Sequence, residues 1–120
     1  QFSRHAHRIQ WDQSAEQIAY HVRAFAPKPG AYTTWQRRSR AQHFKVLEAY
    51  AIPAPSDLST APVGTTFKHE DFPAVVCDEG ALVLQRVQMA GKRPMAGDTF
   101  LHGQRAFVGA VLGSPNPGDT

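Results

Sequence analysis

Hydrophobic and polar residues recur with two different periods along the chain. Between residues 14 and 26, apolar side chains return every three or four positions, which predicts one amphipathic helix. Ser14 followed three residues later by Gln17 is typical of an N-terminal capping box, and Pro27 is expected to end the helix. Trp11 lies just before the helix and is predicted to be an apolar anchor.

Beyond residue 30 the pattern changes to short runs rich in β-branched and aromatic residues, which indicates strands. Strands are predicted at 31–36, 43–50, 64–70, 74–78 and 81–88, with a last strand in 105–113. The sequence C-D-E-G-A-L at 77–82 is typical of a tight hairpin turn, and residues 52–64 form a loop rich in proline and serine. Asp98 is expected to cap a helical turn that stops at Gly103.

One helix followed by five or six closely spaced strands predicts a mainly β fold. The expected architecture is a small, open, antiparallel Greek-key barrel of the OB type with one N-terminal helix. A chain of 120 residues suits a single domain. We place this domain at 9–112, with 1–8 as a leading linker and 113–120 as a flexible tail.

The charges are unevenly distributed along the chain, with a net charge of +3 and a pI near 9.4. No acid occurs between Glu16 and Glu48, and none between Glu79 and Asp98. The two acid-free segments hold Arg23, Lys28, Arg37, Arg38, Arg40, Lys45, Arg86, Lys92 and Arg93. A basic face of this kind suits a polyanionic partner, and a solvated surface with uneven charge is the alternative.

Targeting and redox signals are few. The chain contains no apolar run of membrane-spanning length and no apolar signal core, so no membrane partner is expected. Cys77 is the single cysteine and cannot form an internal disulfide, so it is predicted to be a small buried apolar residue. Together these observations favour a reducing, cytoplasmic setting.

Catalytic and metal-binding patterns are missing from the sequence. The six histidines do not combine with cysteines or carboxylates at metal-ligand spacing. No nucleophile elbow, phosphate-binding P-loop or dinucleotide fingerprint is present. We therefore expect no catalytic residue, no metal and no cofactor in this domain.

A binding function is better supported, because aromatic residues alternate with cations in A-Y-T-T-W-Q-R-R-S-R-A-Q-H-F-K at 31–45. Stacking rings beside phosphate-seeking cations are the ingredients of RNA recognition. Trp35 and Phe44 are more typical of a core than of a stacking surface. For the three arginines at 37, 38 and 40, a solvated hairpin and an RNA contact are equally compatible with the pattern.

Three stretches together resemble one family, the C-terminal domain of methionyl-tRNA formyltransferases. They are W-D-x-S-A-E-Q-I-x-x-x-V-R-A-F-x-P-x-P-G-A at 11–31, C-D-E-G-A-L at 77–82 and L-Q-R-V-Q-M-A-G-K-R-P-M-x-x-x-x-F-L-H-G at 84–103. Their order and spacing agree with the family from about residue 8 to residue 103. Lys28 departs from the pattern, because the family often has Trp between the two prolines.

The resemblance implies an accessory barrel domain whose basic surface holds initiator methionyl-tRNA through its phosphates. It also implies a separate N-terminal formyltransferase domain that binds 10-formyltetrahydrofolate and carries the catalytic Asn-His-Asp set. Asn116 is the only asparagine in this chain, so the chain alone is expected to be inactive.

Lys92 and Arg93 stand where the family has its G-K-[KR] pair, and the resemblance favours them as phosphate contacts. Arg23 matches the arginine of the I-R-A-F segment, where contact with RNA and a role in orienting the helix stay open. The predicted tRNA-binding residues are Lys92, Arg93, Arg37, Arg38, Arg40, Lys45, Lys28 and Arg23.

Two other functions stay open at this stage. The chain is also compatible with the barrel of a sugar-nucleotide or other folate-dependent formyltransferase, or of a related hydrolase, where it would serve packing or oligomerisation without binding tRNA. A free-standing OB-like nucleic-acid binder is the third hypothesis.

Overall fold

The computed structural model describes residues 7–113, and its first element is the predicted helix. Helix α1 (Ala15–Phe25) begins after Ser14, whose Oγ accepts a hydrogen bond from the Gln17 N–H at 3.1 Å. This contact confirms Ser14 as the N-cap and satisfies one of the N–H groups that a helix leaves unpaired. The helix buries one apolar stripe, formed by Ala15, Ile18, Ala19 and Val22.

Within residues 7–113, six strands form one antiparallel sheet. They are β1 (Ala31–Arg37), β2 (Arg40–Ile52), β3 (Thr66–His69), β4 (Phe72–Val76), β5 (Ala81–Met89) and β6 (Met95–Ala96). The spatial order is β1-β2-β5-β4-β3, and β6 pairs with β5. Hairpins join β3, β4 and β5, while the long connection from β2 returns to β3, which is a Greek-key arrangement.

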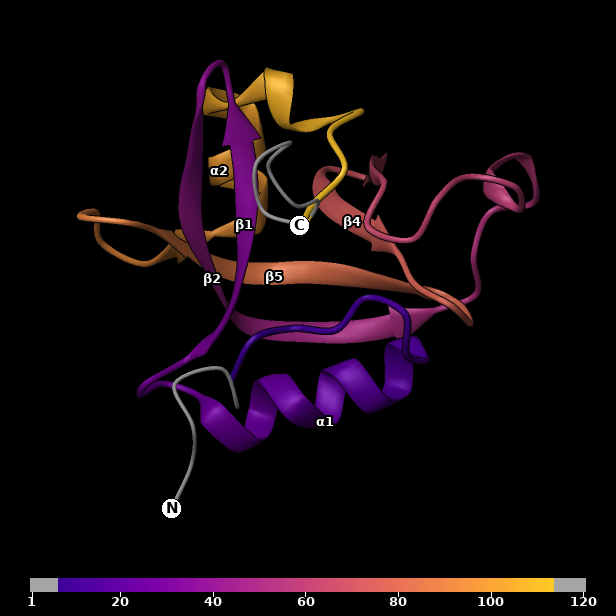
Figure 1. The fold of residues 1–120 in the computed structure, drawn as a ribbon, viewed down its shortest axis with the longest axis horizontal. Coiled ribbons are helices and arrows are strands. Elements are labelled where there is room, and N and C mark those ends of the chain that lie inside the picture. Colours follow the sequence, from indigo (N-terminus) through magenta and orange to yellow (C-terminus); the bar gives the residue numbers. More distant parts are fainter. Residues whose placement is uncertain (1–6, 114–120) are drawn as a thin grey trace.

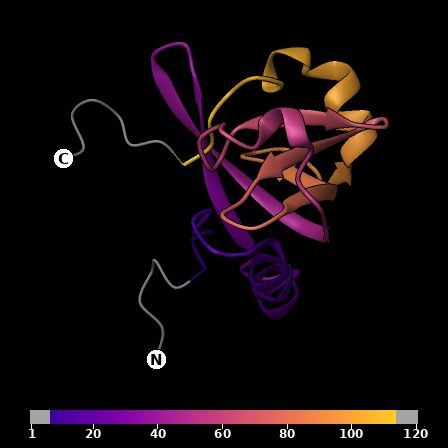
Figure 2. The same ribbon diagram turned by 90° about the vertical axis from the view of Figure 1, so that its right-hand side faces the viewer.

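The sheet curls into a half-barrel, with α1 packed along β2 (Figure 1) and α2 (Gly97–Gly103) packed on β4 and β5. Turned by 90°, the β1–β2 hairpin extends away from the curled strands (Figure 2). The predicted mainly β fold with one N-terminal helix is therefore confirmed. Strand β2 is longer than predicted, and the short strand β6 was not predicted.

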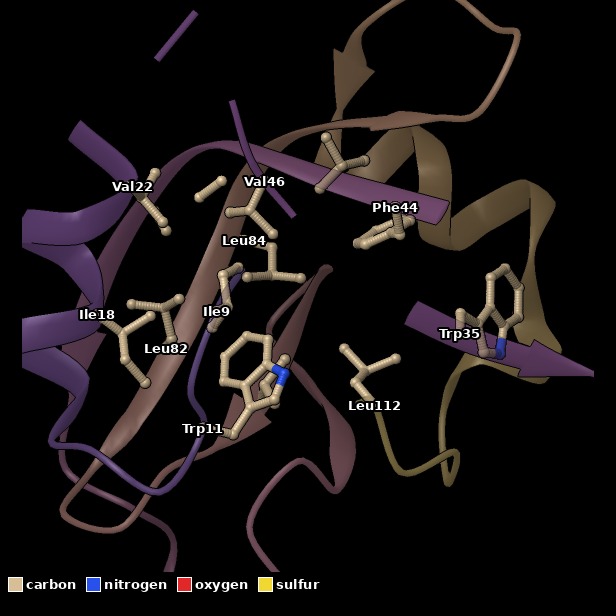
Figure 3. Close-up of a cluster of buried hydrophobic side chains, with 14 of the residues drawn as sticks. Ile9, Trp11, Ile18, Val22, Trp35, Phe44, Val46, Leu82, Leu84 and Leu112 are labelled. Carbon is tan, nitrogen blue, oxygen red and sulfur yellow. The ribbon is translucent and has the colours of Figure 1, made fainter. Parts of the chain in front are cut away.

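A continuous hydrophobic core fills the space between α1, the sheet and α2. Near α1, Ile9 and Trp11 belong to the same cluster as the helix residues and the leucines of β5 (Figure 3). At the other end, four aromatic rings make mutual edge-on or tilted contacts, with centroid separations between 5.0 and 6.5 Å; they belong to Trp35, Phe44, Phe100 and Phe107. Trp35 and Phe44 are thus core residues, as the sequence favoured.

The predicted last strand at 105–113 is wrong. Arg105–Phe107 form a 3-10 turn, and the backbone then turns at Gly109, where φ is +95°. Phe107 is fully buried among the aromatic rings, and the Thr66 hydroxyl donates to the carbonyl oxygens of Phe107 and Ala110. Burial of one ring and these hydrogen bonds therefore replace a regular strand ladder.

Two further expectations are settled at the segment boundaries. Asp98 is not the N-cap of α2, because the helix begins one residue earlier at Gly97, after Ala96. The loop predicted at 52–64 contains a 3-10 turn at Ser56–Leu58. Most of the predicted leading linker and nearly all of the tail, residues 1–6 and 114–120, lie outside the described residues.

Candidate nucleic-acid interface

The tight turn between β5 and β6 presents two exposed cations, Lys92 and Arg93. The turn is held from both sides: the Lys92 N–H donates to Met89 O at 3.0 Å, and Gln88 Nε2 donates to Lys92 O at 2.9 Å. Gly91 adopts a φ of +74°, which a residue with a side chain rarely takes. Lys92 and Arg93 therefore extend from a defined turn.

Lys45 connects this turn with the loop that follows α1. In the sheet register, Lys45 lies opposite Gln88 on β5 and opposite Tyr32 on β1. A Cβ atom added at Gly30 would lie 3.2 Å from Lys45 Cδ, so the lysine stem passes directly over the 27–30 loop. Lys28 is exposed on that loop. The loop that carries Lys28, Lys45 and the turn of Lys92 and Arg93 are therefore neighbours, and we call these four cations the basic strip.

The tip of the β1–β2 hairpin carries three more exposed arginines. Arg37 and Arg40 face each other in the register, and Arg38 sits between them with a φ of +53°. The Arg37 guanidinium lies 4.7 Å from the centre of the Trp35 ring and donates to Gln42 Oε1 at 3.1 Å. Like charges directly opposite on paired strands repel each other, and a bound anion would relieve that repulsion.

The hairpin tip and the basic strip share strand β2. Arg40 and Lys45 are five residues apart on that strand, about 17 Å in extended chain. The β5–β6 turn meets β2 between them, because the Ala90 N–H donates to His43 O at 3.2 Å. Because five residues separate them, Arg40 and Lys45 lie on opposite faces of β2, so the hairpin tip and the basic strip are two basic surfaces joined by one strand.

Arg23 is placed differently from the other predicted residues. It is exposed near the end of α1, and its guanidinium lies 4.7 Å from the centre of the Tyr20 ring. Within residues 7–113 it forms no ion pair with a carboxylate. The structure therefore joins Arg23 to Tyr20 and leaves it outside the basic strip.

A cluster of aromatic rings beside Lys45 was not predicted from the sequence. His43 stacks on Tyr32, with ring centroids 4.2 Å apart and planes inclined by 16°, and His7 lies against the same tyrosine at 4.9 Å. His21 and Phe25 continue the cluster along α1. Burial lowers the pKa of His43, and the charges of Lys45 and His7 lower it further. The only sequence signal was the two-residue spacing of His43 and Lys45 on one strand.

Metal-ligating side chains and surface hollows also bear on the function of residues 7–113. No three histidine, cysteine or acidic side chains there are placed to hold a metal ion. A hollow beside α2 combines Lys68 and Arg105 with Asp71 and Asp98, so its charges are mixed. In the same part of the chain, no helix is both long enough and apolar enough to cross a membrane.

The fold and these surfaces define a small, mainly β domain with two groups of cations, the basic strip and the hairpin tip. Comparison with known proteins assigns it further. Residues 1–105 match the model of the formyl transferase C-terminal domain, and the chain belongs to that family.

Named relatives agree with this assignment. The chain is 41% identical over 108 residues to a methionyl-tRNA formyltransferase of Thiobacillus denitrificans, covering 89% of this chain and 33% of the relative. It is 35% identical over 107 residues to that of Sorangium cellulosum (88% and 33%) and 38% identical over 117 residues to that of Geobacillus thermodenitrificans (94% and 34%). The chain therefore spans about a third of the length of these relatives.

Proposed function

We propose that this chain is the C-terminal domain of a methionyl-tRNA formyltransferase and that it holds the tRNA substrate by its phosphates. The family and the names of the relatives support the parent enzyme. The observation that carries the binding role is the basic strip, in which Gln88 joins Lys45 to the turn of Lys92 and Arg93.

The mechanism of binding is electrostatic. Each cation that neutralises a phosphate releases a counterion, and such contacts position a nucleic acid without reading its sequence. The basic strip supplies such contacts, and the arginines of the hairpin tip, about 17 Å away along β2, offer a second set. Initiator methionyl-tRNA is the proposed ligand.

Catalysis would belong to the rest of the parent enzyme. Because the relatives are about three times as long as this chain, a separate N-terminal domain is implied. In this proposal that domain binds 10-formyltetrahydrofolate and transfers the formyl group to the methionyl amine. The domain described here contributes by holding the tRNA so that its aminoacyl end reaches that site.

A charge-reversal experiment tests the binding role. Binding of labelled initiator tRNA is measured by fluorescence anisotropy across roughly 50 to 200 mM salt, for the wild type and for Lys92→Glu/Arg93→Glu. Loss of two phosphate contacts should weaken binding. It should also make the plot of the logarithm of the binding constant against the logarithm of the salt concentration less steep, by about 2. The loss should be similar for initiator and other tRNAs, because the contacts are to the backbone.

The matched control is Lys68→Glu/Arg105→Glu, which makes the same change in net charge at two exposed cations near α2. Lys68→Glu/Arg105→Glu should bind tRNA far more tightly than Lys92→Glu/Arg93→Glu. Equal losses in both variants would mean that net charge alone attracts the RNA. Failure of the wild type to bind even at the lowest salt would favour a packing or oligomerisation role.

A further inference from the structure

We propose that the imidazole of His43 is a stacking platform for one unpaired nucleobase, beside the basic strip that grips the phosphates. This inference rests on the proposed RNA-binding function and adds a second kind of contact to it. The phosphate contacts hold any stem, whereas the platform would favour a stem that carries an unpaired nucleotide.

The His43 ring is held in a fixed orientation on the surface. The ring of Tyr32, which is only 8% exposed, stacks against its inner face, and the two ring planes are nearly parallel. His43 itself is exposed. One face of the imidazole is thus covered by a buried ring, while the residue as a whole is exposed to solvent. Tyr32 already fixes the orientation of the His43 ring. Binding of a ligand that stacks on His43 therefore costs less free energy for ordering the histidine side chain.

The neighbouring backbone leaves room for a flat ligand. The adjacent segment of the β5–β6 turn is Ala90–Gly91, joined to β2 by the hydrogen bond from Ala90 N–H to His43 O. Ala90 is exposed and small, and a Cβ atom added at Gly91 would meet nothing within 4 Å. The two residues beside the histidine therefore present no bulky side chain that would fill the space.

The charges around the ring match a nucleotide. Lys45 lies two residues further along β2 on the same face, and Lys92 and Arg93 follow directly after Gly91. A base on the ring would keep its phosphates within reach of these cations. Burial and the neighbouring positive charges lower the pKa of His43, so at neutral pH the uncharged imidazole offers an aromatic surface. Histidine is among the side chains on which unpaired RNA bases stack.

The chemistry selects for an unpaired base rather than for a particular base. Every nucleobase has an aromatic face, so stacking tolerates sequence. A base within a duplex is already stacked on both sides and cannot use the ring. The platform should therefore distinguish RNA by its pairing state.

Binding of two labelled RNA hairpins to the 120-residue chain tests this inference at neutral pH. One hairpin has a blunt stem, and the other carries a short single-stranded extension on the same stem. The wild type should bind the extended hairpin more tightly. His43→Ala should lose about tenfold in affinity for the extended hairpin, within the range for loss of one stacked base, and little for the blunt one.

Two further variants test whether the effect comes from stacking on the ring, from the charge of the histidine, or from the loss of any exposed histidine. His43→Phe keeps a ring and should retain the preference for the extended hairpin. His102→Ala removes an exposed histidine on α2 and should change neither affinity. Circular dichroism of each variant verifies that the fold is intact.

Opposite results overturn the platform. If His43→Ala binds the extended hairpin as the wild type does, or loses the same factor for both hairpins, no base stacks on His43. If the wild type binds neither hairpin, the proposed function itself is wrong. The two failures are therefore distinguishable.

Discussion

Trp11 donates its indole Nε1–H to Thr33 Oγ1 over 3.0 Å, and both side chains are buried. This hydrogen bond fixes the segment before α1 to the middle of β1. Without the hydroxyl, the indole N–H would be left buried with no partner, which costs more than the bond itself contributes. The pair thus ties two parts of the chain that are 22 residues apart.

Thr33→Val should therefore destabilise the fold by about 1–3 kcal/mol, although the side chain keeps its shape. Chemical denaturation gives the free energy of unfolding. Thr34→Val is the matched control, because Thr34 is only half-buried and its change should stay within about 0.5 kcal/mol. Similar losses in both variants would show that the Trp11 hydrogen bond is not the cause.

The overall fold could be predicted because its signals are local. Ser14 and Gln17 are three residues apart, and the apolar stripe of α1 repeats with the helical period, so both are visible in one short segment. The hairpin at 77–82 is likewise specified by Gly80, whose φ is +79°. Such features need no knowledge of distant contacts.

The missed features depend on distant contacts. Phe107 is drawn into the core by three rings from other segments, which no local pattern in 105–113 shows. The stack of His43 on Tyr32 depends on the register of β1 and β2, in which Thr34 lies opposite His43 and Tyr32 lies on the diagonal. The basic strip could be listed as cations from the sequence, but only the sheet shows which of them are adjacent.

Two glycines of α2 should respond in opposite ways to the same substitution. A Cβ atom at Gly97 would lie 2.0 Å from the Leu84 carbonyl oxygen, a backbone atom that cannot move aside cheaply. Gly97→Ala should therefore destabilise the fold by roughly 2 kcal/mol or more. At Gly103 nothing lies within 4 Å, so Gly103→Ala should be neutral or stabilise by up to about 1 kcal/mol.

Thermal unfolding of the two variants measures the difference directly. A reversed order, with Gly103→Ala the less stable, would contradict the close approach of α2 to β5. Equal stability would mean that the backbone at Gly97 can relax.

Cys77 should be chemically silent in the folded protein. Burial raises the pKa of its thiol to about 12, so the reactive thiolate is scarce at neutral or mildly alkaline pH. A thiol reagent such as iodoacetamide should label Cys77 only at the rate at which the protein opens. Mass spectrometry with and without denaturant measures this, and rapid labelling of the native chain would show that Cys77 is accessible.

Stability should fall as the pH is lowered, with His21 contributing to the decline. Burial lowers the pKa of His21 below its ordinary value of 6.5. A hydrogen bond with the backbone of His7 acts in the opposite direction, whereas the positive charge of His7 lowers the pKa further. The unfolded chain therefore binds a proton at a higher pH than the folded chain does. The free energy of unfolding should then decrease as the pH falls through 6.5 toward the lower, folded-state pKa.

His21→Phe tests this contribution, because it keeps a ring against Phe25 and removes the titrating nitrogens. Among the described residues, His21 Nε2 is buried with no hydrogen-bond partner, so the variant breaks no hydrogen bond at that nitrogen. Denaturation between neutral and mildly acidic pH should show a shallower pH dependence than in the wild type, with His43 supplying part of what remains. His102→Phe, at an exposed position, should keep the wild-type slope. An unchanged slope in His21→Phe would mean that His21 takes up its proton equally well in the folded and unfolded chains.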